Sequence, residues 1–283
     1  MSGLKLLREF LRAAQDGRMD RRIRSGGRFA RKVFRSIGRA GYLIVVDMGD
    51  YRLALRANDD AFVRHAAMGG DFQRQTFDRA LALIAEHRRL PGDVFLDIGA
   101  NVGSHTIFAA RSGKFHRIVS FEPDPRNVEI AKMNVSLNDL TDMVDVIPIA
   151  CGDTNALMPL SINKNSSTIS SLVRTSIASY EVTVRVRPLD DVLSELAISP
   201  AAVAMVYIDV EGFEPAVVRG AKSIIEASVP MVVEFNPQWY SNGDRQSLVD
   251  ILSKYKNVYD ISGEHPKPAS LDEVGRQTDI LVF

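Results

Sequence analysis

Acidic residues close four short apolar runs of the sequence, and carboxylates in such positions can bind cations, accept hydrogen bonds or take up protons. The four are Asp97, Glu122, Asp209 and Glu234. Because the carboxyl ends of parallel strands share one edge of a sheet, strands in these runs would gather the four acids at one rim. The sequence therefore predicts a negatively charged rim that suits a ligand with positive charge.

The residues around the first acid are typical of a strand, a glycine loop and a helix. Residues 94–96 are apolar, Gly99 and Gly103 bracket a tight loop, and residues 104–110 have an apolar helical face. Such a loop brings the backbone close to a ligand and aims free N–H groups at it. The alternative is an ordinary strand-to-helix turn that binds no ligand.

S-adenosylmethionine matches this loop better than NAD does. A dinucleotide fingerprint reads G-x-G-x-x-G, whereas Asn101 stands at the middle glycine position here and no third glycine follows. Asp97 would repel a pyrophosphate but attract the sulfonium and amino groups of S-adenosylmethionine. An NAD-linked or nucleotide-sugar Rossmann enzyme is the alternative.

Glu122 lies at the end of the second apolar run, directly before Pro123. A carboxylate at this place can accept hydrogen bonds from both ribose hydroxyls of a nucleoside. A surface glutamate before a turn is the alternative. Two acids at the ends of two consecutive strands favour the ribose interpretation.

Asp209 and Glu211 are the candidates for chemistry on the acceptor. They are two residues apart, so on an extended stretch both side chains point to the same side. They could flank an acceptor hydroxyl and take its proton, or bind a divalent metal that lowers the hydroxyl pKa. Alternatively, one caps the next helix and the other is solvated. His105, near the glycine loop, is interpreted as a packing or capping residue rather than a base.

Strand and helix patterns alternate through most of the chain, which predicts an α/β fold with a mostly parallel sheet. The last two strands have no helix between them, so they should form an antiparallel edge pair. The expected strands are residues 94–96, 118–121, 144–150, 203–208, 231–235, 258–261 and 279–283. The expected helices are residues 71–89, 104–110, 125–138, 189–196 with Asp190 as cap, 215–227 and 246–255.

Residues 153–187 interrupt this alternation. Residues 156–162 and 181–186 alternate like strands, and the polar residues 163–171 lie between them. We expect a β-hairpin insertion with a mobile tip that selects the substrate, against the alternative of a solvated loop without function. Another hairpin is expected before the main domain, from residues 42–46 and 51–55.

Composition places the chain among globular proteins. Its 283 residues are 46% hydrophobic, which suits one large domain or one domain with an extension. Zero formal net charge argues against nucleic-acid binding by the whole chain, and the single Cys151 excludes an intramolecular disulfide and a zinc cluster. No apolar stretch approaches the roughly 18 residues that span a bilayer, and no signal peptide is evident. We expect a cytoplasmic protein.

The first 40 residues are strongly basic, with 12 Lys or Arg against three acids and hence a net charge of +9. Residues 4–14 and 29–37 have the spacing of amphipathic helices. Such helices can lie on an anionic membrane, here as a peripheral contact at the inner face, or pack on the enzyme itself or on a second subunit of a homo-oligomer. We therefore divide the chain into a basic helical extension with a hairpin, residues 1–60, and a main domain, residues 61–283.

Three motifs resemble the FkbM-type methyltransferases over roughly residues 75–283. They are the stretches at 95–103 (Phe-Leu-Asp-Ile-Gly-Ala-Asn-Val-Gly), 121–123 (Phe-Glu-Pro) and 208–214 (Ile-Asp-Val-Glu-Gly-Phe-Glu). The resemblance implies a class I methyltransferase fold, Rossmann-like with a seven-stranded sheet, that uses S-adenosylmethionine. It also implies O-methylation of a hydroxyl on a sugar, glycolipid or related small metabolite. A catalytically inactive, membrane-associated adaptor with this fold is the non-enzyme alternative.

The resemblance also implies roles by position. The methionine part of the cofactor would be lined by Asp97, Gly99, Asn101 and Gly103. Glu122 would hold the ribose, Asp153 would lie near the adenine, and Asp209 and Glu211 would stand at the acceptor side. The chain departs from the family at Tyr207, where a lysine is common. Asn236-Pro237-Gln238-Trp239 resembles a motif of amino methyltransferases acting on nucleic acid, but it lacks the second proline and follows the fifth strand instead of the fourth.

Overall fold

The computed structural model describes the chain from residue 43 onward, apart from residues 58, 60–71, 164–169 and 174–178. The chain divides into two compact units, the larger of which comprises Arg74–Asn163 and Ile169–Phe283. The smaller unit contains the predicted first hairpin, in which β1 (Leu43–Asp47) pairs antiparallel with β2 (Arg52–Arg56). The two predicted basic helices, 4–14 and 29–37, and most of the predicted mobile tip lie outside the described residues. Within the part that is described, no helix is both long enough and apolar enough to cross a membrane.

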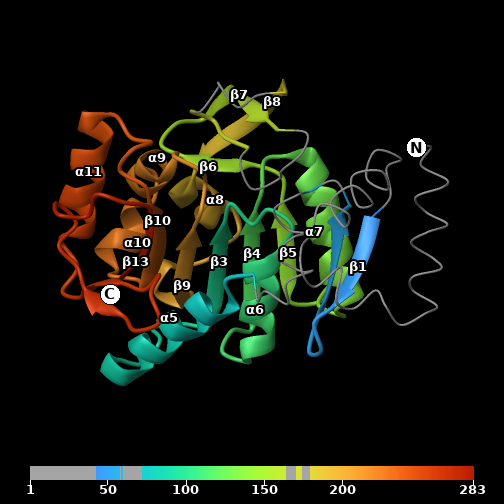
Figure 1. Ribbon diagram of the computed structural model, residues 1–283, viewed down its shortest axis with the longest axis horizontal. Coiled ribbons are helices and arrows are strands. Elements are labelled where there is room, and N and C mark those ends of the chain that lie inside the picture. The colour runs from blue at the N-terminus through green and yellow to red at the C-terminus, as the bar shows by residue number, and fades with distance from the viewer. Residues whose placement is uncertain (1–42, 58, 60–71, 164–169, 174–178) are drawn as a thin grey trace, which may run out of the picture. The chain divides into compact units, whose positions relative to one another are not determined.

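The larger unit is built on a mostly parallel sheet, as the sequence predicts (Figure 1). Its strand order is β12-β11-β13-β10-β9-β3-β4-β5, with parallel pairing from β10 to β5 and antiparallel pairing of β13 with both β10 and β11. The predicted count of seven strands is not confirmed, because the two-residue β12 adds an eighth. The strands are β3 (Val94–Ile98), β4 (Arg117–Phe121), β5 (Val144–Ile147), β9 (Val203–Ile208), β10 (Met231–Phe235), β11 (Val258–Asp260), β12 (Lys267–Pro268) and β13 (Thr278–Val282).

The central strands are apolar because both faces of the sheet are covered. Every residue of β3, β9, β10 and β13 is buried, which matches near-continuous runs of Val, Ile and Leu. The helices of this unit are α5 (Arg74–His87), α6 (Ser104–Ser112), α7 (Pro125–Leu137), α8 (Leu189–Glu195), α9 (Glu214–Arg219), α10 (Lys222–Glu226) and α11 (Asn242–Leu252).

Three helix predictions need correction. The single helix predicted at 215–227 is two helices, because Gly220 interrupts it: a Cβ there would lie 1.8 Å from the carbonyl oxygen of Gly152. The helix predicted at 246–255 begins four residues earlier, at Asn242, because the Ser241 side chain caps it. Asp190 does not cap α8. Its carboxylate instead accepts hydrogen bonds from the backbone N–H and hydroxyl of Ser223.

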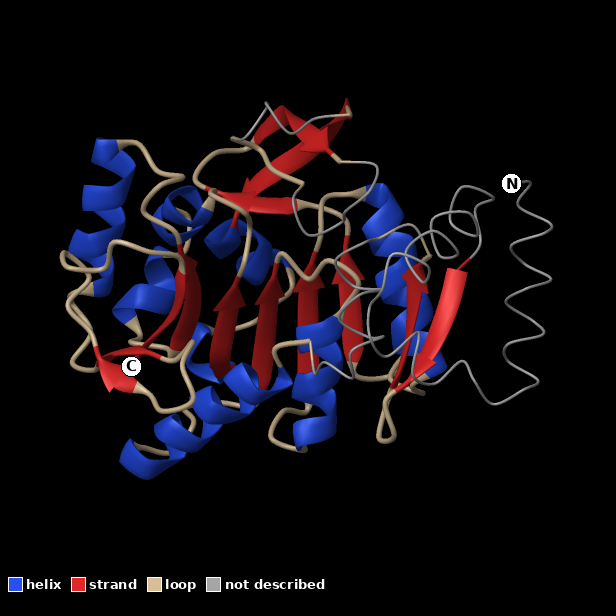
Figure 2. Cartoon of the chain, in the orientation of Figure 1, coloured by secondary structure: helices blue, strands red, loops and turns tan. Residues whose placement is uncertain are grey.

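The predicted strand 144–150 also divides. Pro148 has no N–H to donate, so β5 ends at Ile147. The next strand, β6 (Ala150–Gly152), joins a second sheet of order β6-β8-β7. Its other strands are the predicted hairpin insertion, in which β7 (Ala156–Ile162) pairs antiparallel with β8 (Tyr180–Pro188). Figure 2 shows this small sheet beyond the arrowheads of the main strands, so it lies at their carboxyl edge.

Candidate active site

The structure brings the four predicted strand-end acids to the same edge of the main sheet. Glu234 and Asp97 lie within β10 and β3, and Asp209 and Glu122 directly follow β9 and β4. Ile98 pairs with both Phe121 and Ile208, and Ile208 pairs with Val233, so the residues that follow these positions lie level with one another. Glu234 and Asp209 are thus neighbours along the rim, whereas the end of β3, at Gly99, lies between Asp209 and Glu122. Asp97 lies one residue before Ile98.

The glycine loop is fixed between two strand ends. The N–H groups of Gly99 and Ala100 both donate to the carbonyl oxygen of Phe121, at 2.9 and 3.0 Å. Gly99 has a φ of 88°, and a Cβ at this position would lie 1.8 Å from the carbonyl oxygen of Asp209. Only glycine satisfies both conditions. Gly103 has a φ of 87°, and Asn101 adopts the left-handed region at 52°, where asparagine is tolerated.

Glu122 holds the loop from the other side. Its two carboxylate oxygens accept the backbone N–H groups of Asn101 and Asp124, each at 2.8 Å. Burial raises the pKa of Glu122 to about 7, although these hydrogen bonds favour the ionised form. The Asn101 Oδ1 atom is buried and has no hydrogen-bond partner among the described residues. The loop therefore offers an unused acceptor beside a carboxylate.

Asp97 anchors the helix that follows the loop. The Thr106 hydroxyl of α6 donates to Asp97 Oδ2 at 2.5 Å and lies 2.7 Å from the Ser120 hydroxyl of β4. Burial raises the pKa of Asp97 to about 6. The sequence analysis did not single out Thr106 or Ser120. Ser120 could have been noticed, because it is a polar residue inside the otherwise apolar strand β4. The role of Asp97 toward a ligand stays a prediction.

His105 and Tyr207 form a stacked pair beneath the rim. Their ring centroids are 3.9 Å apart at an interplanar angle of 25°. Burial lowers the pKa of His105 to about 3, so the imidazole is neutral at physiological pH. This environment suits the packing role assigned to His105 and gives no support to a base. The Tyr207 hydroxyl is buried and has no hydrogen-bond partner among the described residues.

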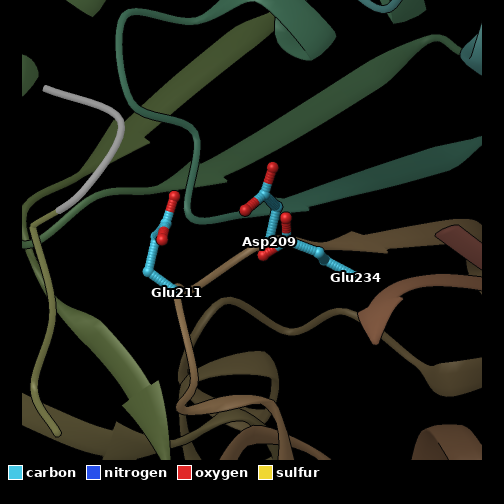
Figure 3. A group of neighbouring side chains, drawn as sticks. All are labelled: Asp209, Glu211 and Glu234. Atoms are coloured by element: carbon cyan, nitrogen blue, oxygen red, sulfur yellow. The ribbon is translucent and has the colours of Figure 1, made fainter. Parts of the chain in front are cut away.

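Three carboxylates form a cluster at the end of β9, which we call the acid trio: Asp209, Glu211 and Glu234. One oxygen from each lies within 4.8 Å of the others (Figure 3). Burial, reinforced by neighbouring carboxylates, raises the pKa of Asp209 and raises that of Glu234 to about 8. Asp209 and Glu211 lie close together, but on a turn and not on the extended stretch from which their pairing was predicted. Glu234 joins them from the adjacent strand.

The alternative that Asp209 or Glu211 caps the next helix is not supported. No side chain caps α9. The Glu214 carboxylate accepts the N–H groups of Val210 and Gly212 instead, at 3.0 and 3.1 Å. Glu211 has a φ of 55°, and its carbonyl oxygen accepts the Ser171 hydroxyl at 2.8 Å. A turn between two fixed ends thus presents the Glu211 carboxylate to Asp209.

Comparison with known proteins decides the family. Residues 97–261, more than half of the chain, match the Methyltransferase FkbM domain. The chain belongs to the FkbM methyltransferase family. It is therefore a methyltransferase, and the α/β fold with its mostly parallel sheet is the class I methyltransferase fold that the sequence predicts.

Individual relatives are distant. The 2-O-methyltransferase NoeI of Sinorhizobium fredii (strain NBRC 101917 / NGR234) is 23% identical over 207 residues, 67% of this chain and 82% of that protein. The crystal structure of Methyltransferase FkbM from Methylobacillus flagellatus KT is 17% identical, with a TM-score of 0.46. The match covers 79% of this chain and 53% of that one, so the chain spans about half the length of that structure. The cofactor-bound Rv0187 from MTB, also 17% identical, has a TM-score of 0.41 over 74% of this chain and 79% of its own.

Asp153, the residue predicted to lie near the adenine ring of this FkbM-family methyltransferase, is far from the glycine loop in sequence and forms its ion pair with another element. Asp153 follows β6, and its carboxylate forms an ion pair with Arg219 of α9 at 2.7 Å. Arg219 also binds Asp244, at 3.0 Å. The role of Asp153 near an adenine ring stays a prediction. In the structure, the ion pairs of Arg219 with Asp153 and Asp244 connect the end of β6 with α9 and α11.

Proposed function

We propose that this methyltransferase is an S-adenosylmethionine-dependent O-methyltransferase that acts on a hydroxyl of a sugar, glycolipid or related small metabolite. The observation that carries the proposal is the direct contact between the glycine loop and the acid trio. Gly99 packs against the backbone of Asp209 so closely that no side chain fits between them. A cofactor on the loop would therefore lie beside the carboxylates that face the acceptor.

The residues of the loop fit S-adenosylmethionine. This cofactor supplies a methyl group on a positively charged sulfur, which becomes a neutral thioether once the acceptor oxygen takes the methyl. The unpartnered Asn101 Oδ1 can accept a hydrogen bond from an amino group. Glu122 Oε1 accepts the Asp124 N–H and, at 3.5 Å, the Asn127 side-chain amide, whereas Oε2 accepts only the Asn101 N–H and keeps a lone pair for a ribose hydroxyl. Asp97, Gly99 and Gly103 complete the proposed cofactor side.

The acid trio provides the groups needed on the acceptor side. An attacking hydroxyl must lose its proton, and an aligned carboxylate can accept it. We assign this task to Asp209 and Glu211, with the O–H bond breaking as the oxygen bonds to the methyl carbon. The distant relative NoeI is a 2-O-methyltransferase by name, which supports oxygen as the acceptor atom. A divalent cation is the second cofactor that we consider for the acceptor side.

Two measurements test the proposal. Calorimetry should show binding of S-adenosylhomocysteine and no binding of NAD, and the reverse would favour the nucleotide-linked Rossmann alternative. Transfer of labelled methyl into a whole-cell extract, followed by identification of the product, should reveal a methyl ether. An extract that takes up no label would favour an inactive adaptor. Unchanged turnover in Asp209→Asn and Glu211→Gln would favour a different acceptor side.

Residues 1–40 carry a separate proposal, based on their charge of +9. We propose that they attach the domain peripherally to an anionic membrane surface. Sedimentation with anionic liposomes should decrease when these residues are removed. Unchanged sedimentation would leave packing on the enzyme or on a second subunit as the explanation.

A further inference from the structure

The acid trio has a feature that proton transfer alone does not explain. Glu234 is 6% exposed, and its Oε1 atom accepts the Gln277 side-chain amide. Its Oε2 atom is buried and has no hydrogen-bond partner among the described residues. In Figure 3 the Glu234 carboxylate lies next to that of Asp209 and faces the same space as that of Glu211. A buried carboxylate oxygen without a donor is costly unless something binds it.

The charge around this oxygen is also unbalanced. Within the described part of the chain, neither Asp209 nor Glu234 forms a salt bridge with Lys, Arg or His. Asp279 of β13 stands directly opposite Glu234 in the strand register and is itself 9% exposed. Like charges placed opposite each other repel. The cluster therefore combines several acids with no basic side chain bonded to the two on β9 and β10.

We propose that Asp209, Glu211 and Glu234 bind a divalent cation of the Mg²⁺ or Mn²⁺ class. Carboxylate oxygens are the ligands these ions prefer, and each carboxylate of the trio can contribute one. Two oxygens bound to such an ion at about 2.1 Å lie roughly 3 Å apart in adjacent positions and roughly 4 Å apart in opposite ones, so oxygens of the trio have to move together by at most about 2 Å. The unpartnered Glu234 oxygen becomes a ligand, and water fills the remaining positions.

The role of this cation rests on the proposed function. The trio supplies three ligands of an octahedral ion, which leaves positions for an acceptor oxygen as well as for water. An ion held there would orient the acceptor hydroxyl next to the glycine loop and stabilise its ionised form. Each carboxylate gives the ion one oxygen, so the second oxygen of Asp209 or Glu211 remains to accept the hydroxyl proton. Binding of the ion itself does not depend on methyl transfer, so the two proposals can be tested separately.

The experiment follows free Mn²⁺ by electron paramagnetic resonance while the metal is added to the full chain, with and without S-adenosylhomocysteine. We expect one Mn²⁺ per chain, displaced by excess Mg²⁺. Glu234→Gln and Asp209→Asn each remove a charged ligand and should weaken Mn²⁺ binding about tenfold or more. Asp279→Asn is the matched control, because this acid lies beside the trio but outside it. The control should keep its affinity within about threefold, since it contributes only through-space attraction.

A second pair of variants tests the cation site without changing any of its ligands. The charges of Asp209 and Glu234 act on the Tyr207 hydroxyl, so Tyr207→Lys places an ammonium group near the trio. This internal cation should abolish Mn²⁺ binding, whereas Tyr207→Phe should retain it. Absence of Mn²⁺ binding by the unaltered chain, or unchanged binding in both Glu234→Gln and Asp209→Asn, overturns the cation site. If S-adenosylhomocysteine still binds in that case, the proposed function survives; if Mn²⁺ binds and S-adenosylhomocysteine does not, only the cation site survives.

Discussion

The Tyr207 ring is stacked on the His105 imidazole, with 3.9 Å between the ring centroids. Each side chain also has a buried polar atom without a hydrogen-bond partner within the described chain. These atoms are the Tyr207 hydroxyl oxygen and His105 Nε2. A stacked aromatic pair stabilises a core by burial and ring contact. The unpartnered hydroxyl works against that gain.

Tyr207→Phe should therefore preserve or raise stability. The substitution keeps the stack and removes a buried hydroxyl that lies among carboxylates, so we expect a gain of up to about 1 kcal/mol in the free energy of unfolding. Urea unfolding followed by circular dichroism measures it. His105→Ala is the contrasting variant, because it removes the stack and should destabilise. A loss of stability in Tyr207→Phe would mean that the hydroxyl has a binding partner.

Gly99→Ala should destroy the glycine loop. The added Cβ would lie 1.8 Å from the Asp209 carbonyl oxygen, and the φ of 88° disfavours any side chain. We expect a loss of at least about 2 kcal/mol in the free energy of unfolding and no measurable binding of S-adenosylhomocysteine. Gly243→Ala is the matched control, because a Cβ there meets nothing within 4 Å and lies in the first turn of α11. Equal stability of the two variants would show that the loop can move away from β9.

The sequence predicted the rim because its signals are local. A glycine loop, an apolar run and a terminal acid are all read within about ten residues, and parallel pairing then places Asp97, Glu122 and Asp209 at one edge. Glu234 was expected at the same rim, but its closeness to Asp209 was not predicted, because this contact depends on the register between two strands. A register of this kind is set by tertiary packing and is not encoded in either strand alone.

The errors in the elements have the same origin. The helix break at Gly220 depends on the approach of Gly152, which is distant in sequence. Asp190 has the composition of a cap, yet it binds Ser223 of another helix. In contrast, the start of α11 at Ser241 was readable from the sequence, since Ser before a polar first turn is a cap signal.

Thr106→Val should lower the stability of the protein, because it removes the hydrogen bond between α6 and Asp97. The valine keeps the size of threonine but removes the hydroxyl that donates to the buried Asp97 carboxylate and contacts Ser120. A buried carboxylate that loses its donor destabilises the fold, here by about 2 to 3 kcal/mol. Thermal or urea unfolding measures the loss. Thr106→Ser retains the hydroxyl and should recover most of the stability; equal losses in both variants would assign the effect to packing.

Binding of S-adenosylhomocysteine should weaken as the pH falls below 7, because Glu122 is proposed to accept a ribose hydroxyl in its ionised form. Burial raises the pKa of Glu122 from 4.5 to about 7 in the ligand-free protein. At pH 8 most of the protein then has an ionised Glu122, whereas at pH 6 most has a protonated one. The apparent affinity should decrease up to about tenfold between these two values.

The same shift predicts the sign of a stability change in the ligand-free protein. The folded state binds the Glu122 proton more tightly than the unfolded state, so the contribution of this group to the free energy of unfolding is greatest below pH 4.5. It decreases by about 3 kcal/mol as the pH rises from 4.5 to 7. Glu122→Gln cannot titrate, so it should flatten the calorimetric affinity profile between pH 6 and 8 and the stability profile between pH 4.5 and 7. A Gln variant that keeps the full pH dependence of binding would assign the titration to another group and remove Glu122 from the ribose site.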